Sequence, residues 1–472
     1  MRVLLVSTYD LGHQPLALGQ LAGAAAGAGH EVRCVDLAVD ELAEADLAWA
    51  EAAVLSVPMH TALRLALEVV GRLRLERPGV PVALCGLYAP VADGHRLIAP
   101  GDLLVAGEAT GPLLEWLSGT RSAAPLVELG PVHLPPGPAP LRALLPPLSR
   151  YARLLSGPSA PRRLAGSTAT TTGCNHRCRH CPVASVYGGR SRLVAEEVVL
   201  ADVASLVEAG AEHLSFTDPD FLNRPRHALT VARAVHEAWP ELTFDATVKV
   251  EHILRHRGLF GELSRLGLRF VVSAFESRDD GVLALLDKGH RAAEEGEAVR
   301  LLRASGIETR PSWLPFSPWT TPTSLADLLV FTAEHDLVWN TDAVQYSIRL
   351  LLPRGSLLLE VQDPTLCATV GALDPESGSV SWRAPDPLLD ELQVALARTA
   401  EDAANRGAGP EESFTAIWAT CQAFGIPLPP HVPPPAASSS AVPGPERPHL
   451  SEAWFCCAEP TVAQLVSTGA TR

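Results

Sequence analysis

The sequence is poor in positive charge and in aromatic residues. Only Lys249 and Lys288 are lysines, aromatic residues make up 5% of the 472 residues, and the formal net charge is −15. A chain with this balance lacks the general basic surface that a phosphate backbone requires, so we expect no nucleic-acid partner. It also has no run of about 18 uncharged apolar residues, so no transmembrane helix and no membrane partner are expected.

Other absences limit the cellular compartment in which we expect the protein and the cofactors that we expect it to bind. No GxGxxG phosphate loop occurs, so a dinucleotide site is not supported. The apolar start, Met1 to Val6, is too short for a signal peptide because Asp10-Leu11-Gly12 interrupts it. The nine cysteines are odd in number and unevenly spaced, unlike a secreted disulfide framework. We therefore expect a cytoplasmic protein with reduced thiols.

What is present is enough apolar sequence, 47% of the chain, to bury sizeable cores. At roughly 150 residues per domain, the length suggests about three domains. In residues 1–120 short apolar strands alternate with helices, which predicts a doubly wound parallel sheet. Ligands of such sheets bind beyond the carboxyl ends of the strands. Residues 121–164, rich in Pro, Leu and Ala, are expected to be a linker.

A second series of strands and helices fills residues 165–355. About six βα units are too few for a closed eight-stranded barrel, so we expect an open, partial (β/α)6 barrel whose last strand is 343–350. The fold class is thus α/β throughout these two domains. Residues 356–425 are expected to be a helical extension. Residues 426–472, dense in Pro, Ser and Ala at first, are expected to be an extended or disordered tether.

Three cysteines near the start of this second series carry the clearest chemistry. Cys174, Cys178 and Cys181 form a CxxxCxxC run within eight residues. Thiolates are the ligands that iron–sulfur clusters select, and three ligands leave one iron open for reaction. The alternative is a zinc knuckle with His176 or His180 as fourth ligand, although zinc sites usually combine two separated ligand pairs.

This cysteine spacing at the head of a βα series resembles the radical S-adenosylmethionine (radical SAM) superfamily, and the resemblance covers residues 165–355. It implies a 4Fe–4S cluster held by Cys174, Cys178 and Cys181. The open iron would chelate S-adenosylmethionine (SAM), and reductive cleavage would give a 5′-deoxyadenosyl radical that acts on a substrate. The resemblance also implies an electron donor, such as flavodoxin or ferredoxin.

The same resemblance suggests further cofactor-binding positions. His180 stands where the family usually has an aromatic residue near the adenine. Asp218, in an Asp-Pro-Asp segment after a strand, could accept from the SAM ammonium group, or it could cap a helix or turn. Glu276 and Ser277 follow another strand and would lie near the SAM ribose or carboxylate, although an acidic strand end could also cap the next helix.

The N-terminal sheet is similar to the cobalamin-binding domains that precede many radical SAM barrels. Its first strand ends in a Gly12-His13-Gln14-Pro15 loop, but the chain lacks the Asp-x-His-x-x-Gly motif that would offer a histidine to cobalt. Two alternatives therefore stay open here: the domain binds cobalamin, or it is a scaffold that has lost it.

The end of the chain carries a second thiol feature, Cys456-Cys457-Ala458-Glu459-Pro460. It resembles the CUAEP/CCAEP-tail radical SAM (seleno)protein family, in which selenocysteine can replace the second cysteine. A position that accepts either residue implies a reactive chalcogen. We assign Cys457 as the attacking atom and Cys456 as the resolving thiol. An accidental pair or a thiophilic-metal site are the alternatives.

The sequence therefore predicts a radical SAM enzyme that acts on an unknown small molecule with the help of the Cys456–Cys457 tail. One alternative is a cobalamin-dependent radical SAM methyltransferase whose tail is not catalytic. Another is a non-catalytic iron–sulfur or thiol protein that senses redox state or handles metal. The substrate itself does not follow from a fold resemblance.

Overall fold

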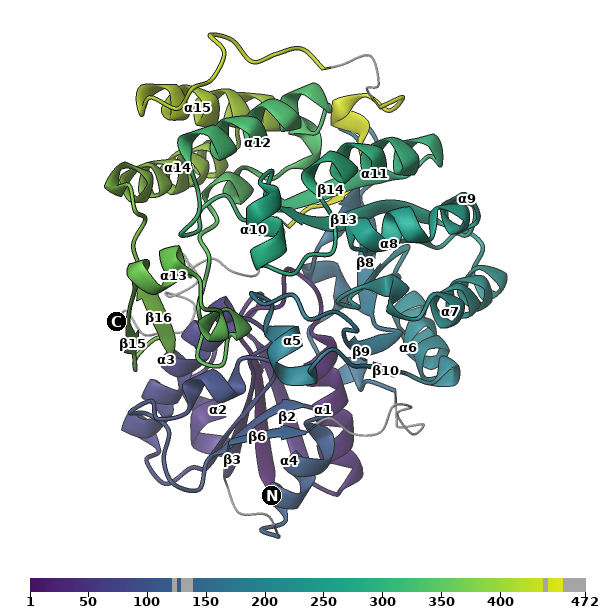
Figure 1. Cartoon of the computed structure of the whole chain (residues 1–472). Coiled ribbons are helices and arrows are strands. Elements are labelled where there is room, and N and C mark those ends of the chain that lie inside the picture. The colour runs from purple at the N-terminus through teal and green to yellow at the C-terminus, as the bar shows by residue number, and fades with distance from the viewer. Residues whose placement is uncertain (121–124, 129–138, 436–439, 453–472) are drawn as a thin grey trace.

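The computed structural model describes residues 1–120, 125–128, 139–435 and 440–452. It has two α/β domains joined side by side, with a C-terminal region that packs against both (Figure 1). Among the helices of these residues, none combines the length and the apolar character needed to cross a membrane.

The N-terminal domain is a six-stranded parallel sheet in the order β2-β1-β3-β4-β5-β6. Alternate residues of β1 and β3 enter two separate cores, one on each face: Leu4 and Leu55 lie in one, Val3 and Val54 in the other. This is the two-sided burial that the continuous apolar strands predict. The elements are β1 (Arg2–Ser7), α1 (Leu16–Gly27), β2 (Glu31–Asp36), α2 (Glu44–Trp49), β3 (Ala52–Ser56), α3 (His60–Glu76), β4 (Val82–Cys85), η1 (Ala89–Ala92), β5 (Leu103–Gly107), α4 (Thr110–Leu117) and β6 (Pro125–Glu128).

The expected linker over 121–164 contributes structure to both domains. Its β6 pairs in parallel with β5 and becomes the edge of the first sheet. Farther on, η2 (Arg142–Leu144) and η3 (Leu148–Arg150) lead into β7 (Arg153–Leu155), which pairs antiparallel with the first barrel strand. The segment therefore connects the two sheets and belongs partly to each.

The second domain is a curved, partial barrel in the order β14-β13-β12-β11-β8-β7-β17. Its parallel strands are covered outside by helices, and its core includes Phe216, Phe244 and Phe275. The elements are β8 (Arg163–Thr168), β9 (Thr171–Gly173), α5 (Pro182–Tyr187), β10 (Ser191–Leu193), α6 (Glu196–Glu208), β11 (His213–Phe216), η4 (Phe221–Asn223), α7 (Pro225–Ala238), β12 (Thr243–Thr247), α8 (Val250–Arg255), η5 (Arg257–Leu259), α9 (Phe260–Arg265), β13 (Leu268–Glu276), α10 (Asp280–Leu285), α11 (Ala292–Ala304), β14 (Glu308–Trp313), α12 (Pro322–Glu334) and η6 (Val338–Asn340).

The partial barrel is confirmed, but the sixth strand expected over 343–350 is wrong. That segment forms the 3₁₀ helix η7 (Ala343–Ser347) and makes only a single parallel bridge, between Phe316 and Arg349. The reason lies at the edge of β14, where the side-chain oxygen of Gln345 accepts the backbone N–H of Trp313 at 3.0 Å. A side chain thus satisfies a group that a neighbouring strand would otherwise pair.

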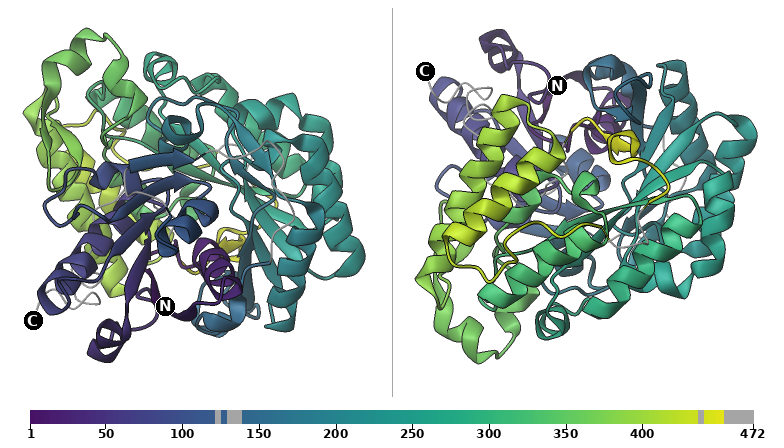
Figure 2. Two further views of the ribbon diagram at one scale, coloured as in Figure 1. Left: turned by 90° about the horizontal axis from the view of Figure 1, so that it is seen from below. Right: turned by 90° about the horizontal axis from the view of Figure 1, so that it is seen from above.

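The C-terminal region is mixed before it becomes helical. Its β15–β16 hairpin reaches back to the N-terminal domain, where Glu376 pairs with Arg96 and with His95. Helices α14 and α15 then pack as an antiparallel pair on the barrel (Figure 2). The elements are η8 (Leu357–Glu360), α13 (Pro364–Thr369), β15 (Val370–Asp374), β16 (Ser379–Trp382), α14 (Pro387–Arg406), α15 (Pro410–Ala423), η9 (Gly444–Glu446) and β17 (His449–Leu450).

Candidate functional site

The CxxxCxxC run forms a loop between β9 and α5, at the carboxyl end of the barrel strands. Cys174 and Cys178 are buried, and Cys181, half-buried, is the N-cap residue of α5. The loop starts at Gly173, whose φ is +72°. A Cβ at Gly173 would lie 2.5 Å from the carbonyl oxygen of Arg190, so the close approach of β9 to the chain before β10 requires glycine there.

Asparagine side chains fix the start of this loop. Asn223 Oδ1 accepts the backbone N–H of Asn175 at 3.0 Å and lies 3.5 Å from Cys174 Sγ. In return, Asn175 Nδ2 donates to the backbone oxygen of Asn223 at 2.8 Å. The segment after β11 therefore holds the first cysteine in place.

The three thiols fit a cluster rather than three separate packing roles. Burial is the main cause that raises the pKa of Cys174 to about 11 and that of Cys181 to about 12, and the charges of neighbouring thiols of the set contribute to both values. Buried thiols of this kind give up their protons when metal binds. Lys288, also buried, lies close enough to Cys178 and Cys181 for their charges to raise its pKa. It would offset the negative charge that three thiolates bring to a cluster.

The two histidines that a zinc knuckle would recruit are engaged elsewhere. His176 Nε2 lies 3.2 Å from His252 Nε2, and His252 Nδ1 lies 3.0 Å from Asp220. His180 Nε2 lies 3.1 Å from a carboxylate oxygen of Glu276. Neither histidine is directed to the thiols as a fourth ligand, which disfavours the zinc interpretation.

Glu276 is the centre of a buried ionic group. It ends β13 with φ +68°, an unusual conformation for a residue with a side chain. One of its carboxylate oxygens, Oε1, accepts from His180 Nε2 and from Lys288 Nζ, each at 3.1 Å. Burial acts to raise the pKa of Glu276, but the charges and hydrogen bonds of Lys288 and His180 outweigh it and lower the pKa overall. The carboxylate is therefore held ionised beside the cysteine loop.

Asp218 and Ser277, two other positions suggested by the sequence, make hydrogen bonds within turns. The Asp218 carboxylate accepts from Thr170 Oγ1 at 2.7 Å, from Thr171 Oγ1 at 2.6 Å and from the backbone N–H of Thr170 at 2.9 Å. It thus secures the approach to the cysteine loop. Ser277 Oγ accepts the backbone N–H of Asp279 in the turn before α10. The structure brings His180 and Glu276 together and places Asp218 in the turn after β11 and Ser277 in the turn after β13.

The carboxyl edge of the N-terminal sheet faces this loop directly. Ala106 of β5 and Leu87 after β4 share an apolar cluster with Cys174, Cys181 and the residues of α5. Glu108, just past β5, accepts from Thr172 Oγ1 of β9 at 2.9 Å. We call this contact between the sheet edge and the cluster end of the barrel the junction; α5 lies within it (Figure 1).

A buried arginine fixes the same two domains on the other side. Arg142 pairs with Asp202 of α6 at 2.9 Å and donates to the backbone oxygen of Gln14 at 3.2 Å. Ser167 Oγ of β8 donates to that same oxygen at 3.1 Å. The loop after β1 is therefore bonded to the barrel. Sequence reasoning did not single out Arg142 and Lys288, whose partners Asp202 and Glu276 lie 60 and 12 residues away in the chain.

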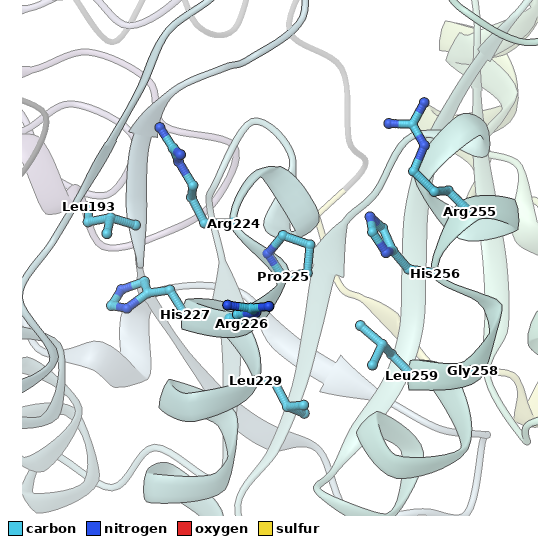
Figure 3. A pocket seen from close by; sticks show the side chains of 10 residues that line it. All are labelled: Leu193, Arg224, Pro225, Arg226, His227, Leu229, Arg255, His256, Gly258 and Leu259. Carbon is cyan, nitrogen blue, oxygen red and sulfur yellow. The ribbon is translucent and has the colours of Figure 1, made fainter.

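A basic cavity of about 660 Å³ lies beside the cysteine loop on the outer surface. Figure 3 shows its lining between the start of α7 and the chain that follows α8, with Arg224 and His227 on one side and Arg255 and His256 on the other. Arg224 lines one side of this cavity. It directly follows Asn223, the residue that holds Cys174 in place. The basic residues that line it are Arg224, Arg226, His227, Arg255 and His256.

Comparison with known families now identifies both domains. A family model described as the B12 binding domain matches residues 2–117, and one described as the radical SAM superfamily matches residues 168–314. The chain therefore carries a B12-binding domain followed by a radical SAM domain. The names of the two families give SAM and cobalamin as the cofactors of these domains. The alternative of a non-catalytic iron–sulfur or metal-handling protein is not supported.

Two curated relatives are methylases. The hopanoid C-2 methylase of Rhodopseudomonas palustris (strain TIE-1) is 24% identical over 290 residues, covering 59% of this chain and 51% of that protein. The hopanoid C-3 methylase of Methylococcus capsulatus (strain ATCC 33009 / NCIMB 11132 / Bath) is 23% identical over 339 residues, covering 67% and 64%. This chain therefore spans between about half and two thirds of the length of these relatives.

Solved structures share the two-domain fold. The cobalamin-dependent SAM radical enzyme OxsB with aqua-cobalamin and SAM bound has a TM-score of 0.66 at 14% identity, covering 85% of this chain and 66% of that chain. The radical SAM methyltransferase TsrM from Kitasatospora setae, with cobalamin and a 4Fe–4S cluster bound, has a TM-score of 0.61 at 16% identity, covering 90% and 99%. The tail residues Cys456 and Cys457 lie outside the described residues of the present enzyme.

Proposed function

We propose that this enzyme is a cobalamin-dependent radical SAM methyltransferase that acts on a small molecule held at the junction. The observation that carries the proposal is the contact of the sheet edge with the cysteine loop, through Glu108–Thr172 and the shared apolar cluster. Ligands of a parallel sheet of this kind bind at that edge. Both cofactors would therefore meet the substrate in one space.

Particular side chains would hold these cofactors. Cys174, Cys178 and Cys181 supply three thiolate ligands, and Glu276 with His180 forms the polar wall that would face SAM. Lys288 keeps Glu276 ionised, so this wall stays an acceptor of hydrogen bonds at neutral pH. When bound, the cluster with SAM and the cobalamin supply electron transfer and methyl-group chemistry that no side chain provides.

The relatives support methyl transfer without identifying the substrate. Both curated relatives are named hopanoid methylases, and TsrM is a methyltransferase whose structure was determined with tryptophan as substrate. These are a lipid and an amino acid, so the shared element is transfer of a methyl group to a small molecule. Methyl transfer is thus better supported than radical chemistry that leaves the methyl group on the methionine released from SAM.

The test is anaerobic reconstitution with iron, sulfide, hydroxocobalamin and SAM carrying a labelled methyl group. We expect the cobalamin absorption to shift on binding, and the labelled methyl group to pass from SAM to cobalamin or to an acceptor and not to remain on methionine. Cys174→Ala should abolish SAM turnover, whereas Cys367→Ala, an exposed cysteine outside the junction, should leave it unchanged. If hydroxocobalamin never shifts in spectrum, or if SAM yields only 5′-deoxyadenosine, the methyltransferase assignment is wrong.

The second candidate function gives the Cys456–Cys457 tail a chemical role. In it, Cys457 is the nucleophile and Cys456 the resolving thiol, as in the resemblance to the CUAEP/CCAEP-tail family. What favours it is that residues 440–452, the described chain before these thiols, are fastened to the barrel through Arg447 and β17. Cys457→Ser separates the two candidates: full methylation by this variant would leave the tail with no part in the reaction.

We also propose that the electron donor docks at the basic cavity beside the cysteine loop. Flavodoxins and ferredoxins are acidic, and charge complementarity speeds association of such partners. This chain carries a net charge of −15, so its own surface elsewhere would repel them. We expect Arg226→Glu with Arg255→Glu to slow cluster reduction by flavodoxin at low salt by about tenfold, while reduction by dithionite stays unchanged.

The control for this docking site is Arg398→Glu on α14, an exposed arginine on the opposite side of the barrel core. It changes the charge by the same amount per residue. If Arg398→Glu slows reduction by flavodoxin as much as either cavity substitution, the effect is one of overall charge, and the cavity is not the docking site.

A further inference from the structure

Three side chains from separate elements meet beside the cysteine loop. His176 lies on the loop itself, between Cys174 and Cys178, Asp220 lies between β11 and η4, and His252 lies on α8. Each of the three offers one ligand atom, and these atoms all lie within 4.8 Å of one another. We call this group the His–Asp triad. It is not among the residues assigned above to the cluster or to SAM.

The distances within the triad are close to those of ligands that share an ion. His176 Nε2 lies 3.2 Å from His252 Nε2, and His252 Nδ1 lies 3.0 Å from Asp220 Oδ2. An ion with bonds of about 2.1 Å to nitrogen and oxygen sets neighbouring ligand atoms about 3.0–3.4 Å apart. His176 Nε2 and Asp220 Oδ2 are 4.0 Å apart, so they would approach by about half an ångström on binding.

Asp220 lacks a counter-charge other than these imidazoles. It is 0% exposed, and among the described residues it forms no ion pair with a lysine or an arginine. Its other partners are backbone N–H groups, that of Leu222 at 2.9 Å and that of Lys249 at 3.2 Å. The ammonium group of Lys249 lies instead 3.5 Å from Glu251 Oε2. Buried charges are paired or coordinate metals, so this carboxylate favours a cation in the triad.

One ring nitrogen of His252 is left without a hydrogen bond. The residue is 5% exposed, and its Nδ1 is buried without a hydrogen-bond partner in the described part of the chain, although Asp220 Oδ2 is only 3.0 Å away. A buried polar atom without a partner costs free energy. A cation that accepts electron pairs from the imidazole and from the carboxylate satisfies both groups at once.

His176 is also placed as a ligand. Its Nε2 faces His252, and its Nδ1 lies 3.7 Å from Glu251 Oε2. Histidines that bind metals commonly have a carboxylate at the other ring nitrogen, which fixes the ring and makes the ligating nitrogen more basic. The His176 side chain is 15% exposed, so an ion can reach the triad from solvent along this residue.

We propose that His176, Asp220 and His252 bind a divalent first-row transition-metal ion at a site separate from the three thiols. Two imidazoles and one carboxylate suit Fe²⁺, Co²⁺ or Zn²⁺, whereas Mg²⁺ and Ca²⁺ prefer oxygen ligands. Three protein ligands leave a position for water or another oxygen ligand. The ion ties the cysteine loop to α8 and to the turn after β11. This site does not depend on which reaction the enzyme catalyses.

The experiment titrates Co²⁺ alone into the full-length enzyme after its 4Fe–4S cluster has been loaded, under anaerobic conditions and without cobalamin. The visible absorption of Co²⁺ distinguishes nitrogen and oxygen ligands from thiolates. We expect about one equivalent of Co²⁺ per chain to bind with bands typical of nitrogen and oxygen ligands. No binding, or binding with thiolate charge-transfer bands alone, would overturn the proposal.

Substitutions then identify the ligands. We expect His252→Asn and Asp220→Asn each to weaken Co²⁺ binding at least about tenfold, with the iron and sulfide content per chain unchanged. The matched control is His256→Asn, because His256 follows α8 one turn beyond His252 and lines the basic cavity (Figure 3). It should leave the affinity for Co²⁺ unchanged. If His256→Asn weakens binding as much as His252→Asn, the ion lies in the cavity and the proposal is wrong.

A second measurement locates the ion without any substitution, so it holds even if a variant loses the cluster or fails to fold. His176 is two residues from both Cys174 and Cys178, which places an ion in the triad close to the cluster. We expect bound Co²⁺ to broaden the electron paramagnetic resonance signal of the dithionite-reduced cluster, whereas Zn²⁺, which has no unpaired electron, should not. An unchanged signal with Co²⁺ bound would overturn the proposal. Absence of methyl transfer would refute the proposed function and leave this result intact.

Discussion

The two sides of the junction treat buried carboxyl groups in opposite ways. On the barrel side, Lys288 and His180 lower the pKa of Glu276 despite its burial. On the sheet side, burial raises the pKa of Asp10 to about 7 and that of Asp36 to about 6, and it also raises the pKa of Glu108. The barrel side therefore keeps a charged carboxylate, Glu276, beside the cysteine loop. The sheet side keeps Asp10 and Asp36 protonated at mildly acidic pH.

This contrast matches what each side would bind. A cluster with three thiolates and the charged ends of SAM needs fixed ions nearby, because a fixed ion in a buried site costs no reorganisation. A large, partly apolar cofactor at a sheet edge needs a wall with few ionised groups. The difference thus indicates that the two faces of one junction are specialised for different cofactors.

The largest expected effect comes from breaking the barrel-side ion group. Glu276→Gln leaves Lys288 buried without its carboxylate, and removal of one partner of a buried pair typically costs 3–5 kcal/mol. We expect a loss of about 3 kcal/mol in the unfolding free energy of the reconstituted enzyme, measured by urea titration. Glu276→Gln combined with Lys288→Met should recover part of it, since both buried charges are then gone.

The matched control for this pair is Glu376→Gln. Glu376 pairs with Arg96 on the surface, with its side chain 49% exposed, and such pairs contribute about 0–1 kcal/mol. A loss from Glu376→Gln as large as that from Glu276→Gln would mean that the barrel-side group has no special role in stability.

A smaller effect is expected from removing residues 440–452, the strap, in which Arg447 pairs with Asp336 and β17 pairs with β7. A chain that ends after residue 435 loses Arg447 and β17 and leaves Asp336 without its guanidinium, so we expect about 2–3 kcal/mol less stability. A chain that ends after Glu452 keeps every strap contact and should be within about 0.5 kcal/mol of the wild type. The two truncations are compared by the midpoint of thermal unfolding. Equal midpoints would show that the strap contributes nothing to the fold.

The cysteine loop was predictable from sequence because its three ligands fall within eight residues and need no partner from elsewhere. The parallel sheet and the partial barrel followed from the alternation of apolar strands and helices, although β6 lies in the expected linker and the strand expected over 343–350 is absent. Lys288 was not predictable as a partner of Glu276, since a helix and a turn with Asp287 at positive φ separate them. The strap falls in a stretch that was predicted to be an extended or disordered tether because Pro, Ser and Ala are frequent there, and one buried arginine with a two-residue strand leaves little signal in composition.

The smallest expected effect concerns the pH dependence of the unfolding free energy, to which Asp10 on the sheet side contributes. A carboxyl group whose pKa is raised on folding holds its proton more tightly in the folded state, so its contribution to stability is present below the unfolded pKa and is lost as pH rises through the folded pKa. For Asp10 the window runs from about 4 to about 7. Burial is the main cause of the raised pKa, the charge of Asp36 adds to it, and Arg142 opposes it. Asp10→Asn should therefore lose about 1–2 kcal/mol less unfolding free energy between pH 5 and pH 7 than the wild type does, as measured by urea titration at each pH.

The control is Asp327→Asn, at an exposed acid on α12, which should leave the wild-type dependence of stability on pH unchanged. If Asp10→Asn keeps that dependence as well, Asp10 is ionised throughout, and the sheet side does not differ from the barrel side in the way proposed.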